Sequence, residues 1–178
     1  FEEWWKKWWK NHFEDTSMEY VLLPGEGSRH NPIGHADGSV RYVDQGRVLL
    51  TNYADLDPEH AGRFKERLQA KGFEVEELSY LSYFDPKQDN TFRSLFDHTW
   101  CYINFLQVGT HLLVPQLGYP ELDREAVRQI KAVFNKADIR CQVHLIDLDM
   151  SSIITKDTLD KRDNGGGALN CLTWTTKE

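Results

Sequence analysis

Two stretches of this 178-residue chain carry the same succession of predicted elements, and this internal repeat limits the possible folds more than any other feature. In the first copy, the turn Gln45-Gly46 separates two short apolar strands. A helix with Asp57 as N-cap and Pro58 at its first position follows, and a third strand closes the copy. The second copy has its turn at Gly109, and its helix begins near Asp123. The expected strands are 40–43, 47–51 and 73–78 in the first copy and 102–106, 111–114 and 140–146 in the second.

A strand–strand–helix–strand unit leaves a hydrophobic edge uncovered, so proteins built of such units need several copies or a closed array. Here the two copies, at about 39–79 and 100–147, follow a partial one made of an N-terminal helix and the strand 19–23. A trailing partial copy occupies 165–178. We therefore expect residues 1–178 to form a single α/β domain that belongs to a larger closed array. The alternative is an ordinary α/β sandwich that only looks repetitive.

The N-terminal segment predicts an amphipathic helix, because its aromatic residues recur at helical spacing. These residues are Phe1, Trp4, Trp5, Trp8, Trp9 and Phe13. A helix docked on a sheet is the simpler interpretation. Tryptophan and lysine also suit a membrane surface, but Glu2 and Glu3 weaken attraction to anionic lipid.

The composition excludes several classes of protein. Hydrophobic residues make up 40% of the chain and charged residues 28%, which is enough apolar material for a core and too much for a disordered chain. No uncharged apolar run approaches the roughly 18 residues of a membrane span. The net charge of −7, without a cluster of Lys and Arg, disfavours nucleic acid and suits a cationic substrate or partner. The three cysteines, Cys101, Cys141 and Cys171, form neither a disulfide framework nor a zinc module, and at least one thiol is free.

The first candidate site is the loop Gly34-His35-Ala36-Asp37-Gly38, just before the first strand of a repeat. His35 can transfer protons near neutral pH, and in an extended segment the side chain of Asp37 points the same way. Such a pair suits the binding and protonation of a cationic, nitrogen-rich group. Two alternatives stay open: a turn capped by Asp37 beside an incidental histidine, and a metal site of His30, His35 and Asp37.

The second candidate site is the segment 164–171, in which three consecutive glycines precede Cys171. Glycines allow the backbone to approach a ligand closely. A free cysteine has a pKa of about 8.5, and His35 could help to form the thiolate of a Cys/His nucleophilic pair. The alternative is a flexible tail that carries a buried cysteine.

The third candidate site is the segment 100–105, which predicts a strand. Cys101 is most simply a core residue there, and Asn104 needs hydrogen-bond partners if it is buried among apolar side chains. Cys141 lies in another predicted strand, and we assign it no role.

Four motifs together resemble agmatine deiminases and bacterial-type peptidylarginine deiminases of the guanidine-modifying superfamily. They occur in the family's order, and the likeness extends from about Tyr20 to Thr173, as if the chain were the C-terminal half of such an enzyme. The motifs are Gly34-His35-Ala36-Asp37 with Arg41, Tyr102-Ile103-Asn104-Phe105, Val114-Pro115-Gln116, and Gly165-Gly166-Gly167 leading to Cys171-Leu172-Thr173.

The resemblance implies a fold of strand–strand–helix–strand blades in a five-bladed α/β propeller of pentein type. It also implies hydrolysis of a guanidinium to a ureido group and ammonia, without metal or cofactor. Cys171 matches the nucleophile, His35 the general acid/base, and Asp37 a guanidinium-binding carboxylate. Gly166 and Gly167 are expected to line the substrate with their backbone. The expected substrate is agmatine, arginine or peptidyl arginine.

The first hypothesis is therefore part of a deiminase, which Cys171, His35 and Asp37 favour for the whole protein. Two departures from the family pattern favour a rival interpretation for this chain. Family members often have histidine immediately before the nucleophile, where this chain has Asn170, and they use another aspartate from an N-terminal half. The rival is a non-catalytic fragment or pseudoenzyme module that binds or assembles. The expected partners are accordingly the guanidinium substrate and either the N-terminal half or another copy, with no nucleic acid and no membrane span. A metal-binding α/β domain is the third possibility.

Overall fold

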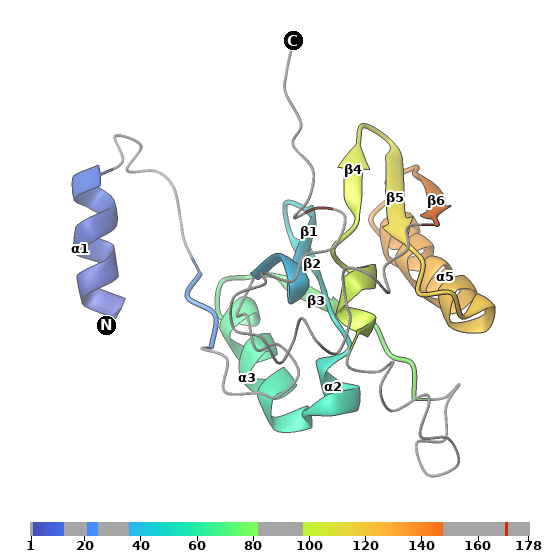
Figure 1. Cartoon of the computed structure of the whole chain (residues 1–178). Helices are drawn as coiled ribbons and strands as arrows, with labels where there is room; N and C mark the ends of the chain where they lie inside the picture. The colour runs from blue at the N-terminus through green and yellow to red at the C-terminus, as the bar shows by residue number, and fades with distance from the viewer. Residues whose placement is uncertain (1, 13–20, 25–35, 82–97, 148–169, 171–178) are drawn as a thin grey trace, which may run out of the picture.

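The computed structural model describes residues 2–12, 21–24, 36–81, 98–147 and 170 (Figure 1). The chain begins with helix α1 (Glu2–His12), which confirms the predicted N-terminal helix. Trp4 of this helix is 58% exposed. The residues 21–24 have no regular structure, so the strand expected at 19–23 is not formed in its described part. None of the described helices is long and apolar enough to cross a lipid bilayer.

The first strand–strand–helix–strand unit forms a three-stranded sheet with the order β1-β2-β3. The first two strands are antiparallel, and the crossover helix returns the chain so that the last strand runs parallel to the middle one. The elements are η1 (Ala36–Gly38), β1 (Val40–Asp44), β2 (Arg47–Leu50), α2 (Tyr53–Leu56), α3 (Pro58–Gln69) and β3 (Glu74–Glu77).

Local sequence explains how α3 begins and how the chain leaves it. The side chain of Asp57 accepts a hydrogen bond of 2.9 Å from the backbone N–H of His60, which confirms Asp57 as the N-cap, and Pro58 stands at the first turn. The helix ends at Gln69, and Gly72 then turns the chain with a φ of +84°, a conformation that favours glycine.

The second unit has the same strand order and the same directions, β4-β5 antiparallel and β5-β6 parallel. Gly109 makes the hairpin turn with a φ of +56°. This agreement of topology is what the repeat interpretation requires. The elements are η2 (Thr99–Tyr102), β4 (Leu106–Val108), β5 (His111–Pro115), α5 (Pro120–Lys136) and β6 (Gln142–Ile146).

The strand expected at 102–106, and with it a strand position for Cys101, is wrong. A 3₁₀ helix ends at Tyr102, and β4 begins only at Leu106. The backbone N–H groups of Cys101, Ile103 and Asn104 each bond to the carbonyl three residues earlier, at 3.0–3.2 Å. Because the side chains from 101 to 105 are all fully buried, the sequence has no apolar–polar alternation with which to distinguish a strand from a helical turn.

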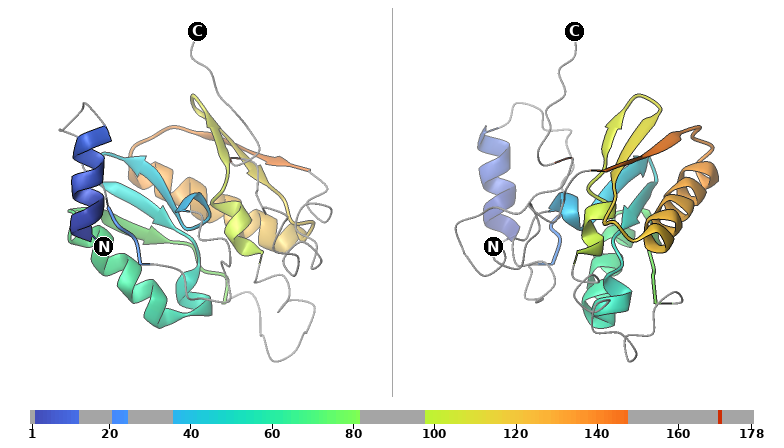
Figure 2. Two further views of the ribbon diagram at one scale, coloured as in Figure 1. Left: turned by 60° about the vertical axis from the view of Figure 1, so that its left-hand side comes forward. Right: turned by 45° about the vertical axis from the view of Figure 1, so that its right-hand side comes forward.

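Helix α5 packs on both sheets and thereby joins the units. One face of the first sheet, with Val48 and Leu50, packs on α3. Its other face, with Leu49, shares a core with Ile130 and Phe134 of α5. The helices α3 (green) and α5 (orange) accordingly lie on opposite sides of the first sheet (Figure 2).

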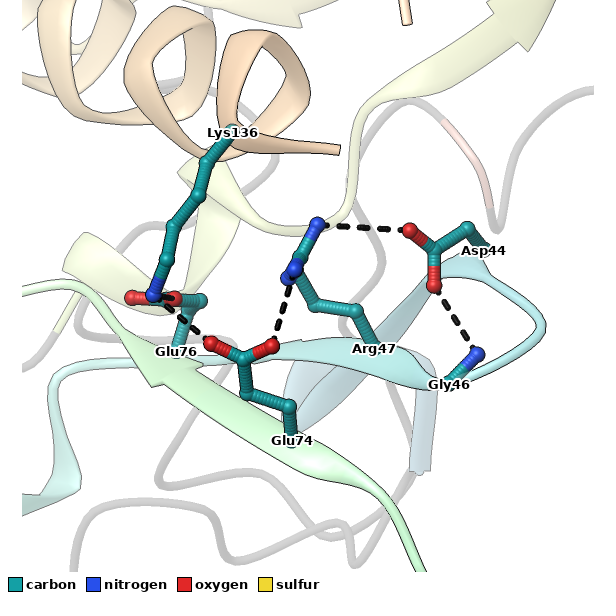
Figure 3. Close-up of polar contacts among 6 residues, drawn as sticks. All are labelled: Asp44, Gly46, Arg47, Glu74, Glu76 and Lys136. Carbon is teal, nitrogen blue, oxygen red and sulfur yellow. Dashed lines mark hydrogen bonds and ion pairs between the residues drawn. The ribbon is translucent and has the colours of Figure 1, made fainter. Parts of the chain in front are cut away.

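A network of ion pairs connects the end of α5 to the edge of the first sheet (Figure 3). Lys136 Nζ lies 2.7 Å from a carboxylate oxygen of Glu74 and also pairs with Glu76. The guanidinium of Arg47 lies 2.8 Å from Glu74 and 3.3 Å from Asp44. The hydrogen bonds from Lys136 and Arg47 lower the pKa of Glu74 to about 2. Most of these side chains are partly exposed to solvent, so we expect the network to contribute little to stability.

Candidate active site

The two units meet at a partly buried polar contact between η1 and the segment that joins η2 to β4. Asn104 is fully buried in this segment, so the condition under which it needs hydrogen-bond partners is met. Its side-chain Nδ2 donates to the backbone carbonyl of Asp37 at 3.1 Å and to Asp37 Oδ2 at 2.9 Å. Asn104 therefore finds hydrogen-bond partners on the loop of the first candidate site.

Asn170 brings a third segment to the same place. Its backbone N–H donates to Asn104, both to the carbonyl oxygen and to the side-chain Oδ1, at 3.0 Å each. Its side-chain Nδ2 donates to Asp37 Oδ2 at 3.2 Å. Three of the four sequence motifs thus converge on one carboxylate and two amides. The sequence motifs alone did not indicate this role for Asn170, although its place directly before Cys171 was a signal.

Close packing fixes the position of the Asp37 loop. A Cβ atom on Gly38 would lie 3.2 Å from the indole of Trp100, so the absence of a side chain lets η1 approach η2. The backbone N–H of Ser39 bonds to the carbonyl of Ala36 at 3.0 Å and closes the turn. The hydroxyl of Ser39 bonds to that of Tyr53 at 2.8 Å in the core of the first unit.

Arg41 brings a positive charge to the junction. Its guanidinium lies 4.6 Å from the centre of the Phe105 ring, which is a cation–π arrangement. Burial lowers the pKa of Arg41, and the negative charge of Asp37 opposes that shift. Two motif residues of the first unit therefore contact the second unit: Asp37 bonds to Asn104, and Arg41 packs on Phe105.

Buried hydrogen bonds hold the segment around Asn104 in place. The hydroxyl of Tyr102 donates to Asp123 Oδ1 at 2.6 Å, and the backbone N–H of Leu117 donates to the same oxygen at 2.8 Å. The hydroxyl of Thr99 donates to Asn52 Oδ1 at 2.8 Å. Burial is the main cause that raises the pKa of Tyr102 far above its usual range, so this phenol is a structural donor.

Of the residues proposed for the site, Asp37 is the one that the structure describes. His35, Cys171, Gly166 and Gly167 lie outside the described residues, and so does His30 of the alternative metal site. Asp37 and Asn170, each within two residues of a predicted catalytic residue, lie in hydrogen-bond contact. In the described part of the chain, no group of three or more His, Cys, Asp or Glu side chains could hold a metal ion.

The two described cysteines have the surroundings of structural residues. Cys101 is fully buried in η2. Cys141 is partly buried, and burial raises the pKa of its thiol. Both thiols are therefore poor nucleophiles.

A separate cavity of about 360 Å³ lies between β3 and α5. Its carboxylates already have basic partners: Glu76 pairs with Lys136, Glu77 with Lys65, and Glu125 with Arg128. None of the four motifs contributes to its lining, which consists of Glu76, Glu77, Ser79, Glu125, Arg128, Gln129, Ala132 and Val133.

The fold and the junction define a mixed α/β protein in which a carboxylate, two amides and an arginine meet between two repeated units. The chain belongs to the Porphyromonas-type peptidyl-arginine deiminase family, which it matches over residues 10–175. This match confirms the resemblance found in the motifs. A comparison with curated protein sequences gave no match.

Solved structures of guanidine-modifying enzymes are similar to the chain. An agmatine deiminase from C. jejuni has a TM-score of 0.55 and 18% identity over 96% of this chain and 45% of its own. A putative arginine deiminase from Porphyromonas gingivalis has a TM-score of 0.46 and 20% identity over 86% of this chain and 40% of its own. An amidinotransferase of saxitoxin biosynthesis from Microseira wollei has a TM-score of 0.49 and 13% identity over 96% of this chain and 36% of its own.

At 18% sequence identity, the likeness to the C. jejuni enzyme shows a shared fold. The chain spans less than half the length of each of these three proteins. The closed five-bladed propeller stays a prediction.

Proposed function

We propose that the chain forms part of a deiminase site that hydrolyses a guanidinium group to a ureido group and ammonia. The observation that carries the proposal is the contact of Asn170 with Asp37 at 3.2 Å. Cys171 follows Asn170 directly, and His35 precedes Asp37 by two residues, so this contact supports a common site for the two proposed catalytic residues. Membership of the peptidyl-arginine deiminase family supports the same chemistry.

In the proposed mechanism, Asp37 binds two N–H groups of the planar guanidinium by charge-assisted hydrogen bonds and fixes its plane. The thiolate of Cys171 attacks the central carbon and forms a C–S bond. His35 gives a proton to the departing nitrogen, so the C–N bond breaks and ammonia leaves. The chain then carries a covalent thiouronium. The backbone at Gly166 and Gly167 lets the substrate approach closely.

Hydrolysis returns the enzyme to its first state. His35 takes a proton from water, and the hydroxide adds to the thiouronium carbon. The C–S bond breaks and its electron pair returns to sulfur. The added hydroxyl group loses its proton to solvent, where it protonates the released ammonia, and the product has a ureido group. No oxidant, metal or cofactor is needed. The substrate is agmatine, arginine or peptidyl arginine, and a second carboxylate comes from an N-terminal half or from another copy of the chain.

A non-catalytic binding module is the second candidate function. The position before Cys171, often histidine in the family, is Asn170 here, and the chain covers 45% of the C. jejuni enzyme. A single carboxylate orients a guanidinium weakly, and the loss of one member of a catalytic set often removes several orders of magnitude of rate.

The test of the proposed function is the selective labelling of Cys171. We expect 2-chloroacetamidine, a guanidinium mimic with a leaving group, to modify Cys171 before Cys101 and Cys141, as measured by peptide mass spectrometry. Ammonia and ureido product are assayed in parallel with agmatine, arginine and an arginyl peptide. Cys171→Ala is the control for both measurements. Equal labelling of the three cysteines would contradict the proposal, and turnover by the monomer that Cys171→Ala abolishes would show that this chain alone has a complete site.

A further inference from the structure

A pair of exposed histidines lies on the second sheet, and neither belongs to the four motifs. His111 begins β5, and His144 lies in β6. The Nδ1 atom of His111 is 2.9 Å from the Nε2 atom of His144. We propose that the two rings form a chelating site for a divalent transition-metal ion that prefers imidazole ligands, Ni²⁺ or Cu²⁺. This site is separate from the proposed function and does not depend on it.

The pairing of the two strands holds the histidines side by side. β5 and β6 are parallel, with His111 opposite Gln142 and Leu113 opposite His144. Because side chains alternate between the two faces of a sheet, His111, Leu113 and His144 project from the same face. The opposite face carries Leu112, which is buried in the core that includes α5. The two imidazoles therefore stand on the open face, on a backbone whose register fixes their offset.

The distance between the two nitrogens fits an ion that binds its ligands at right angles. Metal–imidazole bonds are about 2.0–2.1 Å long. Two such bonds at 90° place the nitrogens about 2.8–3.0 Å apart, whereas a tetrahedral angle requires about 3.3–3.4 Å. The distance of 2.9 Å between His111 and His144 matches the right angle. Cu²⁺ and Ni²⁺ adopt square-planar or tetragonal arrangements, so the geometry favours them over tetrahedral Zn²⁺.

Both rings can bind the ion in their neutral form. In the hydrogen bond between the rings, one of the two facing nitrogens carries a proton and the other accepts it. Because both rings are exposed, exchange with solvent can move that proton to the other nitrogen of the same ring. Small side-chain rotations then turn both lone pairs toward one point outside the sheet, where water completes the coordination. The net charge of −7 favours the approach of a cation.

A hydrogen bond that only joins the two strands is the competing explanation. In that case the loss of either histidine has a small effect on stability, and no metal ion binds. In a chelating site, the second metal bond is intramolecular once the first has formed, so the loss of either ring removes the advantage of the pair. The two single variants, His111→Gln and His144→Gln, should therefore weaken metal binding to a similar degree.

The experiment is isothermal titration calorimetry with nickel chloride at about pH 7.5, with the cysteines kept reduced. We expect His111→Gln and His144→Gln each to lower the Ni²⁺ affinity by about 10- to 100-fold, at least as much as the loss of an outer-shell partner usually costs. The matched control is His12→Gln, which removes an exposed histidine from α1. It should leave the affinity within about twofold. Saturating Ni²⁺ should raise the Tm of wild type and of this control more than that of the two strand variants.

A gain of affinity tests the site from the other direction. Gln142 is exposed and lies opposite His111 on the same face, so Gln142→His supplies a third imidazole. We expect it to raise the Ni²⁺ affinity at least about 10-fold. Gln107→His is the matched control, because Gln107 is also exposed but lies opposite Leu112, on the other face of the sheet. This control should leave the affinity unchanged.

The outcomes decide between a metal site and a hydrogen bond alone. The proposal is overturned if wild type binds no Ni²⁺ at millimolar concentration, or if His111→Gln and His144→Gln bind it as tightly as wild type. Equal gains from Gln142→His and Gln107→His would also contradict it, because they would show that the added histidine does not join the existing pair. Parallel losses in the two single variants, with a gain only from Gln142→His, would support it.

Discussion

The two units of the chain have the same topology but differ in what covers their sheets. The first sheet has α3 on one face and α5 on the other. Leu49 of β2 lies on the face toward α5 and is fully buried. The second sheet packs on α5 with one face, and its other face shows Val108 at 49% exposure. Units of the same topology thus have a buried or an exposed second sheet face, depending on which helices pack on them.

The two sheets also differ in the polar residues at corresponding strand positions. At corresponding strand positions, the first unit has Arg47 opposite Glu74, and the second has His111 opposite Gln142. The first set receives Lys136 from α5. In the second, His111 Nδ1 lies 2.9 Å from His144 Nε2, and both rings are exposed. The first sheet thus has ion pairs between its own strands and further ones from α5, whereas the corresponding positions of the second sheet hold a histidine pair.

The largest expected difference between the sheets is at Leu49 and Leu113, each the third residue of its strand. Leu49→Ala should lower the free energy of unfolding by about 2–5 kcal/mol, because it opens a cavity against α5. Leu113→Ala should cost about 1 kcal/mol, because Leu113 is only partly buried. Urea denaturation measures both. An equal loss at both positions would show that the open face of the second sheet is covered in solution, and sedimentation at several concentrations would then identify self-association.

The next effect concerns the junction at Gly38. Gly38→Ala should lower the free energy of unfolding by about 1–3 kcal/mol, because its Cβ would lie 3.2 Å from the Trp100 ring and force the units apart. Gly62→Ala is the matched control inside α3. Nothing lies within 4 Å of its Cβ, so it should stabilise the protein by about 0.5–1 kcal/mol. Equal and favourable effects would mean that η1 and η2 are not in close contact.

The smallest expected effect is the pH dependence of the ion pairs at Glu74. Its pKa falls from 4.5 to about 2 in the folded state, so the stabilisation is complete above about pH 4.5 and is lost as the pH falls toward 2. Glu74→Gln should be less stable than wild type at pH 6, and the difference should vanish near pH 2 and shrink at 1 M salt. The measurement is urea denaturation at each pH, with Glu66→Gln as an exposed control on α3. A difference that is constant with pH would contradict the role of Lys136 and Arg47.

Much of the first unit could be predicted because its signals are local. Asp57 and Pro58 specify the start of a helix through groups within three residues of each other. The second unit was predicted less well, because the run from 101 to 105 is buried on all sides and its polarity does not alternate. The helix expected near Asp123 begins earlier, at Pro120.

The sequence by itself determined the repeated order of elements, the turns at Gly46 and Gly109, the family motifs and the need of Asn104 for partners. Only the tertiary structure decided what those partners are. Asp37 and Asn104 are 67 residues apart, and Asp37 and Asn170 are 133 apart. Such contacts depend on the packing of whole units against each other, because hydrogen-bond direction and burial arise only when the segments meet. No local pattern of residues specifies them.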